Sequence, residues 1–377
     1  MRAYDDREHF ETVIVGAGQA GLATGYHLAA QGLDFVIVDV RRVGDAWRQR
    51  WDSLRLFTPA ALDGLPGMRF PAPPDAYPAK DEMADYLEAY AMRFGLPLRL
   101  GTSVHRVSRN GDGYALGMDA GMITADNVVV ATGAFQRPRV PAFASALDPR
   151  IVQLHSAQYR RPEQLRDGPV LVVGAGNSGA EIAMDVAARH ETWLSGRDTG
   201  QIPRVFTRPG LPARLFQWVA TSVLTIDRSI GRAYRRRALS RGTPLIRPRR
   251  QDLEAAGIRR VPRTAGVRDG RPVLEDGRVL DVANVVWCTG FRPDFGWIDV
   301  PVFGTDGYPV HYRGVVDAAP GLYFMGLPFL SSLASSSVGG VGRDAEYIVR
   351  HVAARRRPQR ARASGSAPEP ALTGERG

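Results

Sequence analysis

The sequence predicts an α/β fold built from two similar units, the second of which is inserted into the first. Two observations lead to this prediction. An apolar run typical of a β-strand, at residues 12–15 and again at 170–173, is each time followed by a glycine cluster and then by a helical pattern. The runs 128–133 and 285–290 also resemble each other, and each precedes a Phe and an Arg-Pro pair. The chain therefore contains an internal duplication of strand, glycine turn, helix and strand.

The first copy is followed by elements that complete a larger domain. Its helical pattern leads into an apolar run at residues 35–38, which predicts the second strand. Prolines between residues 66 and 78 predict an irregular loop, and the apolar spacing of residues 81–94 predicts a helix after it. Residues 98–107 and 114–118 predict two strands joined by a hairpin turn at 110–113.

The second copy carries an insert without counterpart in the first. Its helix leads to a strand at residues 192–194, and an apolar helical stretch at 211–226 follows. Residues 228–263 then hold 12 Arg against two acidic residues. From these patterns we expect a first domain that starts with residues 1–165, a second domain with the Arg-rich insert over 166–281, a return to the first domain over 282–354, and a disordered tail over 355–377.

Both glycine clusters have the spacing Gly-x-Gly-x-x-Gly in the setting where it carries chemistry, after a strand and at the start of a helix. The first glycine allows the tight turn, the second lets the backbone approach a pyrophosphate, and the third lets helix and strand pack closely. The helix N-terminus favours the negative charge. The sequence therefore predicts two Rossmann-like dinucleotide-binding domains. The residues of the two turns are Gly16, Gly18, Gln19, Ala20 and Gly21, then Gly174, Gly176, Asn177, Ser178 and Gly179.

The residues after the second strand distinguish the two predicted sites. Asp39 lies 23 residues after Gly16, where a carboxylate accepts hydrogen bonds from a ribose 2′-hydroxyl, as in FAD or NAD. Arg197 lies 23 residues after Gly174, where a guanidinium clamps the 2′-phosphate of NADPH, and Ser195 is a further donor. The alternative is that Asp39 and Arg197 are surface charges at strand ends. Two such sites on one chain imply hydride transfer from a nicotinamide to a flavin.

Composition excludes several classes of protein. The chain has 377 residues with 44% hydrophobic and 23% charged side chains, which is ordinary globular usage. One cysteine excludes a disulfide framework, a Cys-x-x-Cys redox pair and a multi-cysteine metal site, and we expect no metal. The net charge of +10 is interpreted as a solvated basic face, without a nucleic-acid partner. The absence of a secretory signal and of a run of ~18 apolar residues predicts a cytoplasmic protein with no membrane span.

The sequence resembles the flavin-containing monooxygenase superfamily, the class B flavoprotein monooxygenases, including Baeyer–Villiger and plant-type flavin monooxygenases. The resemblance runs from about residue 12 to residue 349. It rests on the segments 16–21, 44–48, 131–133, 174–179, 288–291 and 321–326. The sequence departs from the family in the linker, where the fingerprint Phe-x-Gly-x-x-x-His has Pro149, Ile151 and then His155.

The resemblance implies an FAD domain and an NADPH domain and adds residues to the two sites. The added cofactor-binding residues are Trp47, Arg48, Thr132, Gly133 and Gly326 on the FAD side and Thr289 and Gly290 in the second copy. No Ser-His-Asp or paired-carboxylate arrangement is expected, because the flavin carries the chemistry. Asn177, as a helix cap that contacts the NADP pyrophosphate or the flavin, and His155, as a positioning residue, are the catalytic candidates.

The implied activity is a monooxygenase reaction. NADPH reduces FAD, reduced flavin and O2 give a flavin C4a-(hydro)peroxide, and one oxygen atom enters a small organic substrate. Two alternatives stay open. One is an NADPH-dependent flavoprotein reductase that passes electrons to a quinone or carrier without oxygen insertion, and the other is a non-catalytic nucleotide-sensing binding protein. The sequence is compatible with a homodimer.

Overall fold

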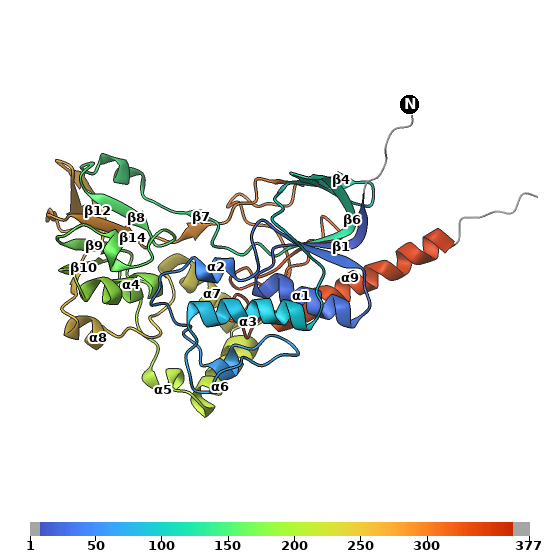
Figure 1. The fold of residues 1–377 in the computed structure, drawn as a ribbon, viewed down its shortest axis with the longest axis horizontal. Coiled ribbons are helices and arrows are strands. Elements are labelled where there is room, and N and C mark those ends of the chain that lie inside the picture. Colours follow the sequence, from blue (N-terminus) through green and yellow to red (C-terminus); the bar gives the residue numbers. More distant parts are fainter. Residues whose placement is uncertain (1–7, 365–377) are drawn as a thin grey trace, which may run out of the picture.

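The computed structural model describes residues 8–364. Two α/β units lie side by side and are joined by a narrow linker that contains β7 (Arg137–Pro138) (Figure 1). The parallel sheets and the two Rossmann-like units confirm the predicted α/β fold class.

The first unit is built on an eight-stranded sheet. Its strand order is β16-β4-β5-β6-β1-β2-β3, and β17 pairs with β6. Parallel pairing places Val15 beside Val38 and Val130, so the ends of β1, β2 and β6 meet at one edge of the sheet. The strands are β1 (His9–Val15), β2 (Phe35–Asp39), β3 (Leu98–Leu100), β4 (Val104–Asn110), β5 (Gly113–Met118), β6 (Gly121–Val130), β16 (Ile298–Asp299) and β17 (Leu322–Phe324).

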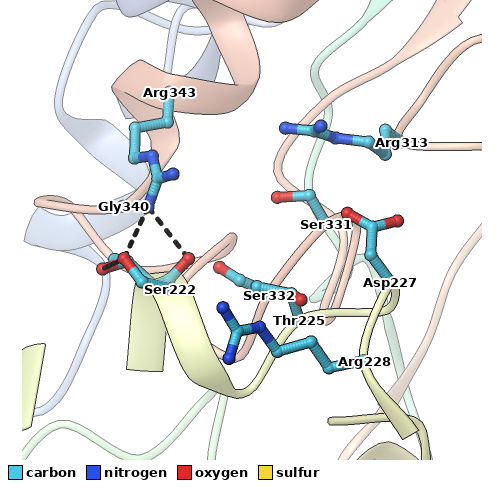
Figure 2. A pocket seen from close by; sticks show the side chains of 10 residues that line it. Ser222, Thr225, Asp227, Arg228, Arg313, Ser331, Ser332, Gly340 and Arg343 are labelled. Carbon is cyan, nitrogen blue, oxygen red and sulfur yellow. Dashed lines mark hydrogen bonds between the residues drawn. The ribbon is translucent and has the colours of Figure 1, made fainter. Parts of the chain in front are cut away.

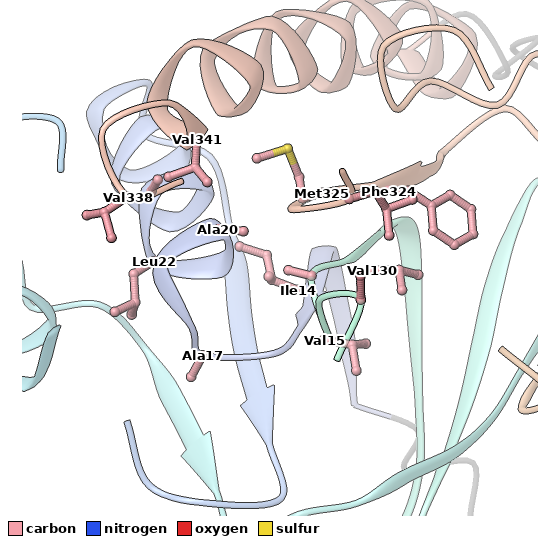
Figure 3. Packing of buried hydrophobic residues seen from close by; sticks show 14 of the residues in the cluster. Ile14, Val15, Ala17, Ala20, Leu22, Val130, Phe324, Met325, Val338 and Val341 are labelled. Atoms are coloured by element: carbon pink, nitrogen blue, oxygen red, sulfur yellow. The ribbon is translucent and has the colours of Figure 1, made fainter. Parts of the chain in front are cut away.

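Three helices pack around the first glycine turn. They are α1 (Gln19–Ala30), α3 (Lys80–Arg93) and α9 (Val341–Ser364), and α1 packs against both of the others. Figure 3 shows Val341, the first residue of α9, and Val338, just before it, in the same core cluster as Ala20 and Leu22 of α1. Leu22 is fully buried, and burial of such a side chain stabilises the fold by about 1.5–3 kcal/mol. The apolar core therefore fixes the helix that follows the glycine turn.

The second unit is built on a five-stranded parallel sheet of order β11-β10-β9-β14-β8. Its strands are β8 (Val152–His155), β9 (Val170–Val173), β10 (Thr192–Ser195), β11 (Arg259–Val261) and β14 (Asn284–Trp287). The predicted second domain, 166–281, contains neither β8 nor β14, although β14 lies between β9 and β8. The boundaries predicted at 165 and 282 therefore differ from the sheet pairing, which local patterns do not reveal.

Both crossings of the chain between the units lie next to each other. β7 pairs antiparallel with β15 (Phe291–Arg292), with Phe291 opposite Pro138. The rings of Phe135 and Phe291 meet edge to face at 5.5 Å, and Arg137 Nε lies 2.7 Å from Asp294 Oδ2. The two units are thus connected through one small antiparallel ribbon.

The insert covers the space between the units. It contains α5 (Arg204–Thr207), α6 (Leu211–Trp218), a π-helical turn (Val219–Val223), α7 (Ser229–Arg241) and α8 (Arg250–Ala255). Thr225 forms an isolated bridge with Ser332, so the insert contacts the part of the chain that returns to the first unit. The remaining elements are α2 (Asp45–Arg48), α4 (Asn177–Ala187), β12 (Thr264–Arg268), β13 (Arg271–Leu274) and the 3-10 turns Ala60–Leu62, Ala142–Ala146 and Pro162–Gln164.

The C-terminal helix is longer than predicted. A disordered tail was expected from residue 355, but α9 continues through Ser364. Arg356, inside this helix, forms an ion pair with Glu11 at 2.9 Å. Residues 365–377 of the predicted tail lie outside the described residues. Within residues 8–364, no helix combines the length and apolar character that a membrane crossing requires.

Candidate dinucleotide sites

The first glycine turn leaves one open face. Gly16 has φ +116°, and a Cβ there would lie 2.6 Å from Ala131 O, so the tight turn against β6 requires glycine. A Cβ at Gly21 would lie 1.8 Å from Gly16 O, which holds α1 close to the turn. A Cβ at Gly18 would meet no atom within 4 Å. The turn is therefore closed toward the protein at Gly16 and Gly21 and open at Gly18.

The second glycine turn repeats this geometry. Gly174 has φ +113°, with Cys288 O at 2.2 Å from the position of a Cβ, and a Cβ at Gly179 would lie 1.7 Å from Gly174 O. Gly176 again faces open space. Both turns stand at the N-terminus of a helix, α1 or α4, where backbone N–H groups favour an anion. The residues present fit a dinucleotide pyrophosphate at each turn.

The Asp39 carboxylate lies beside the first turn and makes that edge acidic. Its Oδ2 accepts a hydrogen bond of 2.7 Å from the N–H of Ala17, and its Oδ1 accepts one of 2.9 Å from the N–H of Arg41. These bonds hold the carboxylate beside the glycine turn. Because each carboxylate oxygen accepts more than one hydrogen bond, the group still has capacity for a ribose hydroxyl.

Arg197 is not the structural equivalent of Asp39, which corrects the equivalence predicted from residue counts. Val15 pairs with Val38 in the first sheet, whereas Val173 pairs with Ser195 in the second. The connection is one residue shorter because α1 has 12 residues and α4 has 11. Gly196 therefore takes the place of Asp39, and Arg197 follows it.

The edge of the second turn is nevertheless basic. Gly196 carries no carboxylate, and a Cβ there would lie 2.6 Å from Ala175 N, so this residue packs directly on the glycine turn. The exposed Arg197 comes next, and its guanidinium has no hydrogen bond or ion pair with any residue from 8 to 364. The N–H groups of the Arg197 guanidinium thus lie beside the second turn with no acceptor among the described residues.

Two predicted contact residues of the second turn are engaged elsewhere. Ser195 is fully buried, and its hydroxyl donates to Pro262 O at 2.9 Å and lies 2.8 Å from Thr264 Oγ1. Asn177 does not cap α4; its Oδ1 accepts from the N–H of Ile246 at 2.8 Å, and its Nδ2 donates to Pro244 O at 3.2 Å. Asn177 instead holds residues 243–246 of the insert.

Trp47 and Arg48 on α2 point in different directions. Trp47 Nε1 donates to Gln19 Oε1 at 3.4 Å, which places the indole beside the first turn. The Arg48 guanidinium lies 2.7 Å from Asp85 and 3.1 Å from Glu88, both on α3, and also donates to Val43 O. Arg48 therefore ties α2 to α3, and its charge is already neutralised by protein carboxylates.

The two Thr-Gly pairs that follow β6 and β14 belong to the linker. Gln136 Nε2 donates to Thr132 Oγ1 at 2.6 Å and to Gly133 O at 2.8 Å, and its Oε1 accepts from Asp294 N at 2.7 Å. The Thr289 hydroxyl donates to Arg139 O, and Gly290 O accepts from Arg139 N at 2.9 Å. Gln136, which sequence reasoning missed, thus links the first pair to Asp294, whereas the second pair is bonded to Arg139. No local motif marks Gln136.

His155 is a neutral structural residue. Its Nδ1 accepts from the N–H of Ala157 at 3.1 Å, so Nε2 carries the proton and donates to Gly290 O at 3.0 Å. Burial lowers the pKa of His155, and the nearby Arg50 guanidinium lowers it further. Both ring nitrogens are occupied, so His155 connects β8 to the linker and has no free nitrogen for proton transfer.

The remaining predicted residues lie at the two turns. A Cβ at Gly326 would lie 3.1 Å from the Cβ of Ala20, so the chain after β17 returns to the first turn. Ser178 is exposed beside the second turn. Sequence reasoning missed Glu181 on α4, which lies 3.7 Å from Arg247 of the insert and whose pKa burial raises to about 7. No sequence spacing connects these two residues.

The described residues offer neither a reactive thiol nor a cluster of metal-binding side chains. Cys288 is the single cysteine of the sequence, and burial raises the pKa of its thiol to about 12. A thiol that stays protonated is a poor nucleophile. Residues 8–364 contain no group of three or more His, Cys, Asp or Glu side chains suited to a metal ion.

Comparisons with known proteins agree with this geometry. Two models of the pyridine nucleotide-disulphide oxidoreductase family match residues 13–205 and 116–326. An oxidoreductase of Geobacillus kaustophilus described as CzcO-like is 39% identical over 91% of this chain and 98% of its own length. The indole-3-pyruvate monooxygenase YUCCA4 of Oryza sativa is 26% identical over 91% of this chain and 87% of its own length.

Among solved structures, a flavin-containing monooxygenase from Stenotrophomonas maltophilia superposes with a TM-score of 0.76 at 29% identity. The match covers 93% of this chain and 99% of that chain. It therefore spans both sheets and the linker between them. The chain belongs to the pyridine nucleotide-disulphide oxidoreductase family and, within it, to the flavin monooxygenase superfamily, as a flavin-dependent oxidoreductase.

Proposed function

We propose that the protein is an FAD-dependent, NADPH-using monooxygenase that inserts one oxygen atom from O2 into a small organic substrate. The observation that carries the proposal is the pair of glycine turns with the same geometry and opposite edges, acidic at Asp39 and basic at Arg197. An acidic edge suits the ribose hydroxyls of FAD, and a basic edge suits the 2′-phosphate of NADPH. Relatives named as monooxygenases over most of the chain support the reaction type.

The chain's own residues would bind and orient the two cofactors. Gly18 and Asp39 would hold the FAD pyrophosphate and ribose, and Trp47 and Gly326 border the same turn. In the second unit, the open face at Gly176 and the Arg197 guanidinium would hold NADPH. When bound, FAD supplies the redox chemistry by accepting hydride and activating O2.

The linker would set the distance between the two cofactors. Thr132, Gly133 and Asp294 are fixed to one another by Gln136, and His155 fixes β8 to Gly290. These bonds join the ends of both sheets and orient one turn relative to the other. The single cysteine leaves no cysteine pair for dithiol chemistry, which favours oxygen transfer over disulfide reduction.

The decisive experiment follows the oxygen atom. Purified protein loaded with FAD is supplied with NADPH under 18O2 and a panel of amines, sulfides, ketones and 2-oxo acids. We expect substrate-stimulated NADPH oxidation and one 18O atom per product molecule, with Gly176→Ala as a variant that weakens NADPH use. If NADPH reduces a quinone while no product carries 18O, the protein is a reductase. If the protein is colourless and cannot be reconstituted with FAD, the remaining function is nucleotide binding without catalysis.

A further inference from the structure

A polar cavity lies apart from both glycine turns. It has a volume of about 260 Å³, close to the lower end of small-molecule pockets, ~300 Å³. Its walls come from residues 221–228 of the insert and from the C-terminal part of the chain at Arg313, Ser331, Ser332, Gly340 and Arg343. None of these residues belongs to either glycine turn.

Three guanidinium groups surround this cavity. Figure 2 shows the side chains of Arg228, Arg313 and Arg343 arranged around Ser331 and Ser332. Arg343 donates to Thr221 O at 2.9 Å, which fixes its position at the start of α9. The guanidinium of Arg313 lies over the ring of Tyr347 at 4.2 Å. Each guanidinium offers five N–H donors and no acceptor, so the walls are rich in charged donors.

Two of these three guanidiniums have no acceptor in the part of the chain that the structure describes. Within residues 8–364, the guanidiniums of Arg228 and Arg313 form no hydrogen bond or ion pair, and Nε of Arg313 is buried without a partner. Ser332 is 6% exposed and lines the cavity, yet its hydroxyl has no hydrogen-bond partner among the described residues. Arg228 is exposed to solvent, so the donor that indicates a ligand is the buried Nε of Arg313, which has no acceptor among residues 8–364.

The acidic residues nearby neutralise this charge only in part. Asp227 is the one carboxylate among the described residues of the cavity wall, and its Oδ1 accepts from the Tyr312 hydroxyl at 2.7 Å. Asp344 is buried next to the wall, where its Oδ1 accepts from the Ser331 hydroxyl and its carboxylate interacts electrostatically with Arg313 and Arg343. Three cations against two carboxylates leave a positive excess. Like charges around one cavity repel one another unless an anion binds between them.

A two-residue turn positions Arg313 at the cavity. Arg313 has φ +50° and Gly314 has φ +88°, and Tyr312 and Val315 on either side exchange two backbone hydrogen bonds of 2.9 Å. These positive φ values are those of a tight hairpin turn. The turn holds the Arg313 side chain between Tyr347 and the cavity.

We propose that this cavity binds the oxyanion group of a small molecule, a carboxylate or a phosphate, through Arg228, Arg313, Arg343 and the Ser332 hydroxyl. The site is separate from the two nucleotide turns. The N-terminus of the long helix α9, beside Gly340, adds a favourable field for the same anion. The inference does not depend on oxygen insertion, because it concerns binding alone.

The test measures anion binding with both nucleotide turns filled. FAD-loaded protein with saturating NADP+ is titrated with potassium phosphate or with sodium succinate, and potassium chloride at equal ionic strength is the reference. Calorimetry gives the dissociation constant, and the thermal unfolding midpoint gives a second readout. We expect saturable binding of at least one oxyanion. Phosphate alone identifies a phosphate site, succinate alone a carboxylate site, and both together a general oxyanion site.

Two variants assign the binding to the cavity. Arg228→Gln removes an exposed guanidinium that has no partner among the described residues, so it should keep the fold and weaken anion binding by at least about tenfold. Arg343→Gln should act in the same direction. Arg268→Gln, an exposed arginine on β12, is the matched control and should bind as the unmodified protein does. Equal effects of both oxyanions and chloride, or unchanged binding in Arg228→Gln, would overturn the proposal.

Discussion

At the scale of single residues, we propose that one exposed guanidinium sets the selectivity for NADPH over NADH. Gly196 replaces the carboxylate that the first turn has at Asp39, and Arg197 stands next to it with no acceptor among residues 8–364. A charged hydrogen bond contributes about 1.5–3 kcal/mol. Arg197→Gln should therefore lower the ratio of kcat/KM for NADPH to that for NADH by roughly 10–100-fold. Steady-state kinetics with both nucleotides measure this ratio.

The control and the contrary result are equally specific. Arg268→Gln changes an exposed arginine in the same unit and should leave the ratio unchanged. Arg197→Asp should lower the ratio further, because a carboxylate repels the 2′-phosphate. A preference for NADPH that survives both substitutions would move the phosphate contact to another residue.

Asp63 is a second residue whose environment makes a measurable prediction. The side chain is 1% exposed; its Oδ1 accepts from the Thr58 hydroxyl, and its buried Oδ2 has no partner within residues 8–364. Burial raises the pKa of Asp63 to about 7. The folded protein thus holds this proton more tightly than the unfolded chain, so the associated stability is present at low pH and is lost as the pH rises toward 7.

Asp63→Asn removes this dependence on pH. The variant should gain about 2–3 kcal/mol in free energy of unfolding relative to the unmodified protein as the pH rises from 5 to 8, because pH 5 lies about two pKa units below the folded-state pKa of about 7. Urea unfolding at both pH values measures the difference. Asp75→Asn, at an exposed carboxylate, should show no such change. The same stability difference at both pH values would contradict a protonated Asp63.

The sequence predicted which residue types lie near the two turns better than it predicted where their side chains point. Asp39 lies at the turn where its spacing placed it, because strand, turn and helix are contiguous in sequence. Ser195 and Asn177 have residue types suited to a phosphate contact, yet their hydrogen bonds go to Pro262 and to residues 243–246, which are distant in sequence. Arg48 is likewise taken by Asp85 and Glu88 of α3. Such partners come from tertiary packing, which no local pattern encodes.

At the scale of elements, some glycines of each turn pack against the protein backbone, whereas the middle glycine faces open space. A Cβ at Gly179 would lie 1.7 Å from Gly174 O, whereas a Cβ at Gly176 would meet no protein atom within 4 Å. Gly179→Ala should therefore push α4 off the turn and lower the unfolding midpoint of the cofactor-free protein. Gly176→Ala should leave that midpoint unchanged.

The same pair should differ in nucleotide binding. Gly176→Ala places a methyl group on the open face of the turn, so NADPH affinity should fall at least about tenfold at unchanged stability. Fluorescence titration of NADPH and thermal unfolding give the two readouts. NADPH that binds Gly176→Ala as tightly as the unmodified protein would remove the pyrophosphate from this turn.

The order of elements along the chain was predictable, but their pairing was not. The hairpin at residues 110–113 is present, with Asn110 opposite Gly113, because glycine and a short connection define it locally. β8 and β14 join the second sheet through parallel pairing between strands that are distant in sequence. The predicted boundaries therefore left both strands outside the second domain, although β14 pairs with β9. The count-based equivalence of Arg197 and Asp39 failed for a related reason, since a one-residue difference between α1 and α4 shifts the register.

At the scale of the whole molecule, the position of the linker defines where the second unit can be separated. β7 and β15 pair with each other, so the chain enters and leaves the second unit at one place. All five strands of the second sheet lie between residues 139 and 290, and we propose these residues as the NADPH-binding domain. A domain that contains its complete sheet has the backbone hydrogen bonds that it needs to fold alone.

Two fragments test this division. The fragment 139–290 keeps β14 between β9 and β8, so it should unfold cooperatively and bind NADPH without FAD. The fragment 166–281 lacks β8 and β14, which leaves β9 as an unpaired edge at the centre of the original sheet, and it should aggregate or stay unfolded. Circular dichroism melts and NADPH titration compare the two. In the longer fragment, Thr221 and Thr225 lose their contacts with Arg343 and Ser332 of the first unit. If this fragment does not fold, the insert needs the first unit for folding, and the two units form one cooperative structure.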